Sequence, residues 1–70
     1  MNNTLYITNR TGKPMVATIS DNYTGSDVVK CELQPGSNRI EVDSLDTGTY
    51  YISLVNHNND IIYKEKIVKN

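Results

Sequence analysis

The sequence predicts an all-β fold, a small antiparallel immunoglobulin-like β-sandwich of six or seven strands that forms one domain over residues 1–70. Three observations favour this class. Seven Ile, six Val and five Tyr supply most of the bulk, with no Trp or Phe, and β-branched residues and Tyr prefer strands. Turn-forming residues recur about every eight to twelve positions, a spacing typical of sandwiches and barrels. Apolar and polar residues alternate between these turns, as expected of strands with one buried face.

The first predicted strand covers residues 3–9 and places Leu5 and Ile7 on one face. The strand ends because Gly12 tolerates a positive φ and Pro14 lacks the amide hydrogen that a sheet needs. The next two strands are expected at 15–20 and 27–33, on either side of a polar loop at 21–26. Their side chains expected to face the core are Met15, Ala17, Ile19, Val29, Cys31 and Leu33.

A Pro-Gly turn at 34–37 leads into the clearest alternation of the chain, residues 38–43, with Ile40 and Val42 facing inward. Residues 44–48 then cross over to a strand at 49–55. The inward side chains of that strand are expected to be Tyr50, Ile52 and Leu54.

The last predicted strand, residues 61–68, follows an Asn-rich hairpin loop at 56–60. Its apolar residues do not alternate cleanly with its polar ones. This irregularity predicts either a β-bulge or a position at the edge of a sheet.

A Leu-x-x-Gly-x-Tyr motif begins at Leu45 and continues through Gly48 to Tyr50, and a Lys-rich final strand closes the chain. Over residues 40–69 this pattern resembles the C-terminal sorting domains of Bacteroidetes type IX secretion cargo, small immunoglobulin-like sandwiches. Asp46 stands where that family usually has Pro, and the family's Pro-Asn-Pro entry segment is absent. Besides the three motif residues, the positions that match the family pattern are Lys66, Ile67 and Lys69.

The same motif is also what a tyrosine corner requires, in which a Tyr hydroxyl hydrogen-bonds to a backbone group upstream and fixes the crossover between strands. We therefore expect Leu45, Gly48 and Tyr50 to form a structural corner. A motif of this kind indicates the fold better than it indicates the activity.

The charge distribution argues against several classes of partner. Seven basic residues nearly balance eight acidic ones, and no basic stripe is present that would neutralise nucleic-acid phosphates. No apolar stretch approaches the roughly 20 residues of a membrane helix, and the N-terminus lacks the basic start and apolar core of a signal peptide. We expect no nucleic-acid partner and no membrane insertion.

The sequence contains no recognisable catalytic or metal-binding constellation, so we expect no enzyme, no metal and no cofactor. His57 lies in the Asn-rich loop without a ligand or base at a suitable spacing. Cys31 is expected to be a buried structural thiol rather than a reactive one, since no His lies nearby in sequence and the adjacent Lys30 is expected to face water on the opposite side of the strand. Asn-x-Thr triplets at Asn2, Asn9 and Asn22 are expected to carry no glycan, because an export signal is missing.

The remaining feature with functional promise is a set of tyrosines expected on the surface: Tyr6, Tyr51 and Tyr63. Exposed Tyr supplies a large contact area at low entropic cost. We therefore predict a non-catalytic structural or docking module that contacts other protein subunits through a sheet face or its edge strands, with a homo-oligomer as one option. Such a module suits an accessory subunit, such as a phage virion decoration or tail-associated protein. It equally suits a sorting-domain-like module of a secreted protein, so a virion or the cell surface is the expected location. The alternative is a carbohydrate-binding module that uses the same tyrosines.

Overall fold

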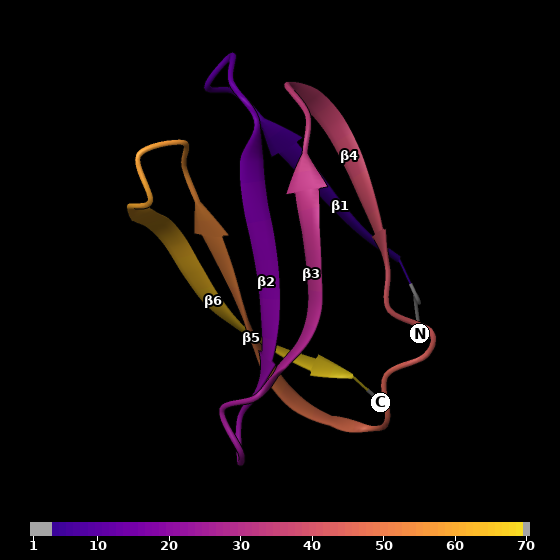
Figure 1. The fold of residues 1–70 in the computed structure, drawn as a ribbon. Helices are drawn as coiled ribbons and strands as arrows, with labels where there is room; N and C mark the ends of the chain where they lie inside the picture. Colours follow the sequence, from indigo (N-terminus) through magenta and orange to yellow (C-terminus); the bar gives the residue numbers. More distant parts are fainter. Residues whose placement is uncertain (1–3, 70) are drawn as a thin grey trace.

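The computed structural model describes residues 4–69, and these residues form six β-strands and no helix. None of them therefore belongs to a helix that could cross a membrane. Figure 1 shows the course of the chain, in which every pair of neighbouring strands is antiparallel. The strands are β1 (Thr4–Asn9), β2 (Met15–Asp21), β3 (Asp27–Leu33), β4 (Gly36–Glu41), β5 (Gly48–Val55) and β6 (Ile61–Lys69).

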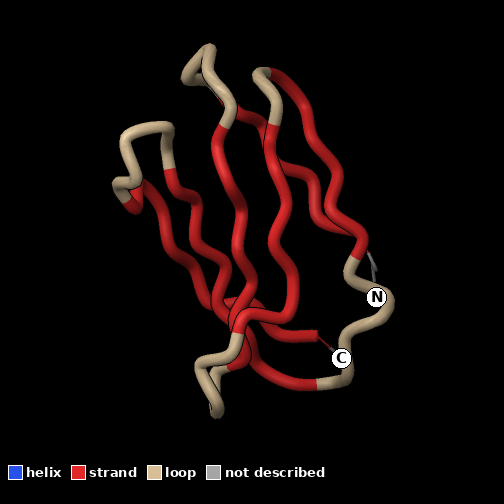
Figure 2. The backbone as a smooth tube through the Cα atoms, viewed as in Figure 1, coloured by secondary structure: helices blue, strands red, loops and turns tan. Residues whose placement is uncertain are grey.

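The strands belong to two sheets of unequal width. β1 and β4 form a two-stranded sheet, whereas the other sheet has four strands in the order β3-β2-β5-β6. The loops gather at the two ends of the strands (Figure 2). The predicted all-β sandwich with six strands is confirmed. The division into two and four strands differs from the four and three of an immunoglobulin constant domain, so the immunoglobulin-like topology stays a hypothesis.

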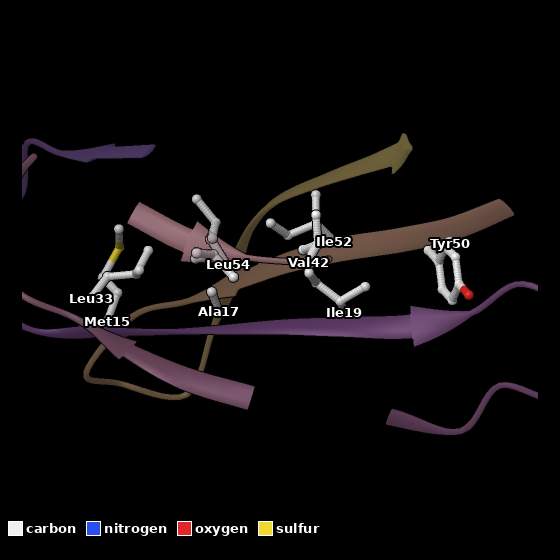
Figure 3. Packing of buried hydrophobic residues seen from close by; sticks show 9 residues of the cluster. Met15, Ala17, Ile19, Leu33, Val42, Tyr50, Ile52 and Leu54 are labelled. Carbon is white, nitrogen blue, oxygen red and sulfur yellow. The ribbon is translucent and has the colours of Figure 1, made fainter. Parts of the chain in front are cut away.

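The core lies between the sheets and consists of nine buried apolar residues. Alternate residues of β2 and β5 face the core, and the antiparallel register pairs Ala17 with Leu54 and Ile19 with Ile52. Figure 3 shows the side chains of this core and labels those of β2 and β5 together with Leu33 and Val42, with Tyr50 at one end. This arrangement confirms the inward residues predicted for both strands. The complete set is Met15, Ala17, Ile19, Leu33, Ile40, Val42, Tyr50, Ile52 and Leu54.

The fourth strand begins earlier than the alternation indicated. The prediction placed it at residues 38–43, but β4 begins at Gly36 and ends at Glu41. Gly36 has φ +101°, and it pairs with Asn9 so that the β1–β4 ladder continues into the turn. Val42 is buried as expected although it lies beyond the end of β4. Residue 3 of the predicted first strand lies outside the described residues.

Asn9 ties the two sheets together at one end of the sandwich. This last residue of β1 is 2% exposed, and its Nδ2 donates to the carbonyl oxygens of Lys13 at 2.7 Å and Leu33 at 3.2 Å. Its Oδ1 accepts hydrogen bonds from the amide and the hydroxyl of Thr11 at 3.0 Å and 2.7 Å. The Asn9 side chain is therefore inaccessible from solvent in the folded protein.

The irregular last strand, β6, combines both features that its sequence predicted. It is an edge strand of the four-stranded sheet. Its register against β5 shifts between Leu54 and Val55, which marks a bulge or irregularity. Most of β6 is exposed, in contrast to the alternately buried β5.

Candidate functional site

The inner face of β6 is largely uncovered, although the same face of its neighbour β5 forms part of the core. Residues paired across an antiparallel ladder share one face of the sheet. Leu54 pairs with Tyr63, yet Leu54 is 8% exposed whereas Tyr63 is 48% exposed. Glu65, the partner of Ile52, is also exposed. The two-stranded sheet therefore does not extend far enough to cover β6.

The uncovered face forms the floor of a groove of about 460 Å³ between β1 and β6, here called the β1–β6 groove. β1 lines one side of it through four consecutive residues, Leu5 to Thr8. The lining residues contributed by β5 and β6 are Ile52, Leu54, Ile62, Tyr63, Glu65 and Ile67. Most of these side chains are aliphatic or aromatic, so the groove is predominantly apolar.

The polar groups of the groove are few. The Tyr63 hydroxyl donates a hydrogen bond to the carboxylate of Glu65, which lies two residues along the same face. This hydrogen bond is the main reason that the pKa of Tyr63 is raised, and partial desolvation and the negative charge of Glu65 act in the same direction. Arg10 and Thr11 line the groove where the chain leaves β1. The apolar centre thus has one carboxylate, and that carboxylate already has a partner.

The three candidate interface tyrosines do not form one platform. Tyr6 is 74% exposed and lines the β1–β6 groove together with Tyr63. Tyr51 lies on the outer face of the four-stranded sheet, paired with Ser20 and Lys66. The Lys64 ammonium lies 5.3 Å from the centroid of the Tyr51 ring, a cation–π contact that partly covers the ring. Tyr6 and Tyr63 therefore both border the groove, although the Tyr6 side chain points away from the core, and Tyr51 lies on the opposite face of the four-stranded sheet.

The Leu-x-x-Gly-x-Tyr segment is fixed by hydrogen bonds at the end of the sandwich opposite Asn9. The buried Tyr50 donates its hydroxyl to the carbonyl oxygen of Asp46 at 2.7 Å, as a corner requires. Lys69 donates from Nζ to the carbonyl oxygen of Leu45 at 2.5 Å, which ties the end of β6 to the same crossover. A Cβ atom on Gly48 would meet the Tyr50 ring at 3.9 Å, an ordinary contact, so the local space does not require glycine there.

His57 and Cys31 lie apart from the groove. His57 is exposed in the β5–β6 loop and shares a shallow hollow with Glu32 and Pro14. Cys31 is half-buried on β3, where burial raises the pKa of its thiol. Within residues 4–69, no group of three or more His, Cys, Asp or Glu side chains is placed to hold a metal ion.

The chain matches no protein-family model, no curated protein and no solved structure. The resemblance to secretion sorting domains therefore stays a prediction that rests on the residues quoted for it.

Two features of the structure, one in the groove and one at the end of the sandwich, were not predicted from the sequence. Ile62 and Glu65 were overlooked because the final strand was judged only as irregular, and its inner face follows from the register with β5. The poor alternation was itself a signal, since a strand covered on one face would have shown a cleaner pattern. Asn9 was predicted to end the first strand and to begin an Asn-x-Thr triplet, and its buried hydrogen bonds were not predicted, although an Asn side chain commonly accepts from the backbone two residues further on, as Asn9 does from Thr11.

Proposed function

We propose that this protein is a non-catalytic docking module that acts through protein–protein contacts. The supporting observation is the exposure of four large apolar side chains on one edge strand, β6. Full burial of such a side chain contributes roughly 1.5–3 kcal/mol, and because these are about half exposed, a partner gains about 1 kcal/mol for each one that it covers. The exposed residues are Ile61, Ile62, Tyr63 and Val68.

The charges of β6 support a specific contact rather than indiscriminate association. Lys64, Glu65 and Lys66 occupy the middle of the strand, between the apolar stretches 61–63 and 67–68. Charged residues on an edge strand oppose uncontrolled pairing with other edges, while the apolar ends remain available for a matching partner. This pattern favours recognition of a particular surface.

Two biological settings use this chemistry, and the proposal includes both. In one, the protein is an accessory subunit of a larger assembly, such as a virion decoration or tail-associated protein of a phage. In the other, it is a sorting-domain-like module of a secreted protein, which the residues Leu45, Tyr50 and Lys69 support because they join in one corner. Virion structural genes beside the coding sequence, or a cargo domain fused upstream, would distinguish the settings.

The carbohydrate-binding alternative has less support. Sugar rings stack on aromatic side chains that face the same way, whereas Tyr51 and Tyr63 lie on opposite faces of one sheet. A glycan array probed with the protein and with Tyr51→Ala tests this alternative. Binding that Tyr51→Ala abolishes, with the fold intact, would establish it.

Photo-crosslinking in the cells that produce the protein tests the docking function. A photoreactive amino acid replaces Ile61, whose register with Val55 places it on the outer face, and separately replaces Lys30 on β3 at the other edge of the sheet. We expect one defined protein, identified by mass spectrometry, to be joined through position 61 and not through position 30. If neither position 61 nor other exposed β6 positions yield a specific adduct from folded protein, the docking function is wrong.

A further inference from the structure

The side of the β1–β6 groove formed by β1 is the edge of that strand. Successive side chains of a strand point to opposite faces, so one face contributes only alternate residues to a cavity. Leu5, Tyr6, Ile7 and Thr8 all line the groove, although Leu5 and Ile7 pack against the core and Tyr6 points away from it. The common feature of these four residues is that they lie along the edge of β1 that faces away from β4. Among residues 4–69, β4 is the only strand that pairs with β1, so this edge carries unpaired backbone groups.

The groove floor beside that edge is wide enough for one more strand to be added to the smaller sheet, next to β1. Neighbouring strands lie about 4.8 Å apart, and the two-stranded sheet is two strands narrower than the sheet it faces. The missing width coincides with the inner face of β6, where Ile62 is 47% exposed and Tyr63 is similarly uncovered. A strand added to β1 would therefore lie directly over these side chains.

We propose that the β1–β6 groove binds an extended segment of another polypeptide, which adds to β1 as a third strand of the smaller sheet. The six residues of β1 span about 20 Å, so the bound segment is four to about six residues long. Its alternate residues are apolar and enter the groove, while the intervening residues face solvent beside Tyr6. This inference rests on the proposed docking function and names its site and the chemistry of its partner.

The chemistry of the groove selects this occupant over a small apolar molecule. An apolar molecule would cover the floor but leave the amide and carbonyl groups of the β1 edge unpaired away from bulk water, which costs free energy. A strand satisfies those groups through main-chain hydrogen bonds and fills the groove with every second side chain. Glu65, the carboxylate of the groove, already accepts a hydrogen bond from Tyr63, so the apolar floor matches uncharged inward residues.

A second copy of the chain does not fit in the same way. Pairing of two β1 strands about a twofold axis would continue the smaller sheet from one copy into the other. The larger sheet of each copy projects beyond β1. In such a dimer, the projecting β6 of one copy would therefore occupy the space beneath β1 of the other copy. The core residues of the other copy already fill that space. The occupant is therefore an extended segment that carries no second sheet packed against the side that enters the groove.

A peptide titration followed by NMR tests this inference. The probe is a synthetic peptide of alternating Val and Thr with a Lys at each end, added to the ¹⁵N-labelled protein. The control is the same peptide with alternate backbone amides N-methylated, so that its side chains are unchanged but its pairing edge is blocked. We expect the first peptide to shift the β1 amide signals and slow their exchange with solvent, and the N-methylated peptide to bind at least fivefold more weakly.

Two matched substitutions locate the site. Ile62→Lys places a charge in the groove, whereas Val28→Lys places one on β3, at the other edge of the same sheet. Both positions are about equally exposed, 47% and 42%, so neither change should unfold the protein. We expect Ile62→Lys to weaken peptide binding at least fivefold and Val28→Lys to leave it unchanged.

Several results would overturn the inference. Equal binding of the two peptides would mean that the groove accepts side chains without backbone pairing. Shifts confined to β3, or no shifts at all, would mean that the β1 edge does not accept a strand. A protein that sediments as a dimer with its β1 amides already protected would identify a second copy as the occupant. In each case a specific adduct at position 61 would leave the docking function standing, because Ile61 is on the outer face.

Discussion

Replacing Asn9 with Ala removes the polar contact that joins β1 to the end of β3. Four hydrogen bonds disappear, and the most costly loss is the one to the Leu33 carbonyl, since this contact is buried and water cannot easily replace it. The Lys13 carbonyl oxygen lies 3.0 Å from the Thr11 hydroxyl, which can donate its one hydrogen there once Asn9 Oδ1 is gone. A buried polar group that loses its partner costs about 1–3 kcal/mol, so we expect Asn9→Ala to lower the free energy of unfolding by about 2 kcal/mol.

This loss is large for so short a chain. At about 0.05–0.15 kcal/mol per residue, 70 residues give a total stability of roughly 4–10 kcal/mol. A change of 1 kcal/mol shifts the melting temperature of a domain of this size by about 4–8 °C, so Asn9→Ala should lower it by about 8–16 °C. Urea unfolding followed by circular dichroism measures the free energy, and a thermal scan measures the shift.

Asn22→Ala is the matched control, because Asn22 also begins an Asn-x-Thr triplet but is exposed in the β2–β3 loop. Its backbone amide bonds to the Thr49 carbonyl, and this contact survives the substitution. We expect a change within about 0.5 kcal/mol.

Asn9→Asp separates the donor role of the side chain from its acceptor role. The carboxylate would face two carbonyl oxygens, so its pKa should lie above the ordinary value of about 3.9, and the variant should be at least as unstable as Asn9→Ala at pH 7. Stability should return as the pH falls and the protonated acid donates again. A loss below about 0.5 kcal/mol for Asn9→Ala, or an Asn9→Asp variant more stable than Asn9→Ala at pH 7, would refute the reasoning.

Three further predictions concern the corner, the thiol and the groove. Tyr50→Phe removes the hydrogen bond to Asp46 and should cost about 1 kcal/mol in urea unfolding, whereas Gly48→Ala should cost less, and equal losses would contradict the corner. Because burial raises the pKa of the Cys31 thiol, little thiolate exists at pH 7. Iodoacetamide should therefore alkylate folded Cys31 more slowly than the urea-unfolded chain, with a rate that rises toward high pH, and equal rates would show that burial does not matter. Glu65→Gln should lower the pKa of Tyr63, measured by NMR titration of ¹³C-labelled tyrosine, and an unchanged value would mean that the Tyr63–Glu65 hydrogen bond is absent in solution.

The alternation in the sequence determined the strand interiors of this protein. In the stretches that became β2 and β5, every second residue is apolar, and a strand exposes alternate residues to the same face. Met15, Ala17, Tyr50 and Leu54 could therefore be assigned to the core before any pairing was known. The Leu-x-x-Gly-x-Tyr spacing likewise anticipated a Tyr50 hydroxyl near the backbone four residues upstream, because that contact is local.

The tertiary structure alone decided which surfaces remained open. Whether the smaller sheet covers the Tyr63 side chain depends on the widths of the two sheets. Those widths follow from the pairing of β1 with β4, two strands that are separated by more than 25 residues of chain. The burial of Asn9 is equally non-local, since its Leu33 partner lies 24 residues away. Alternation specifies which side of a strand is apolar, but it does not specify what the opposing sheet covers. For that physical reason, the β1–β6 groove could be recognised only once the sheets were placed against each other.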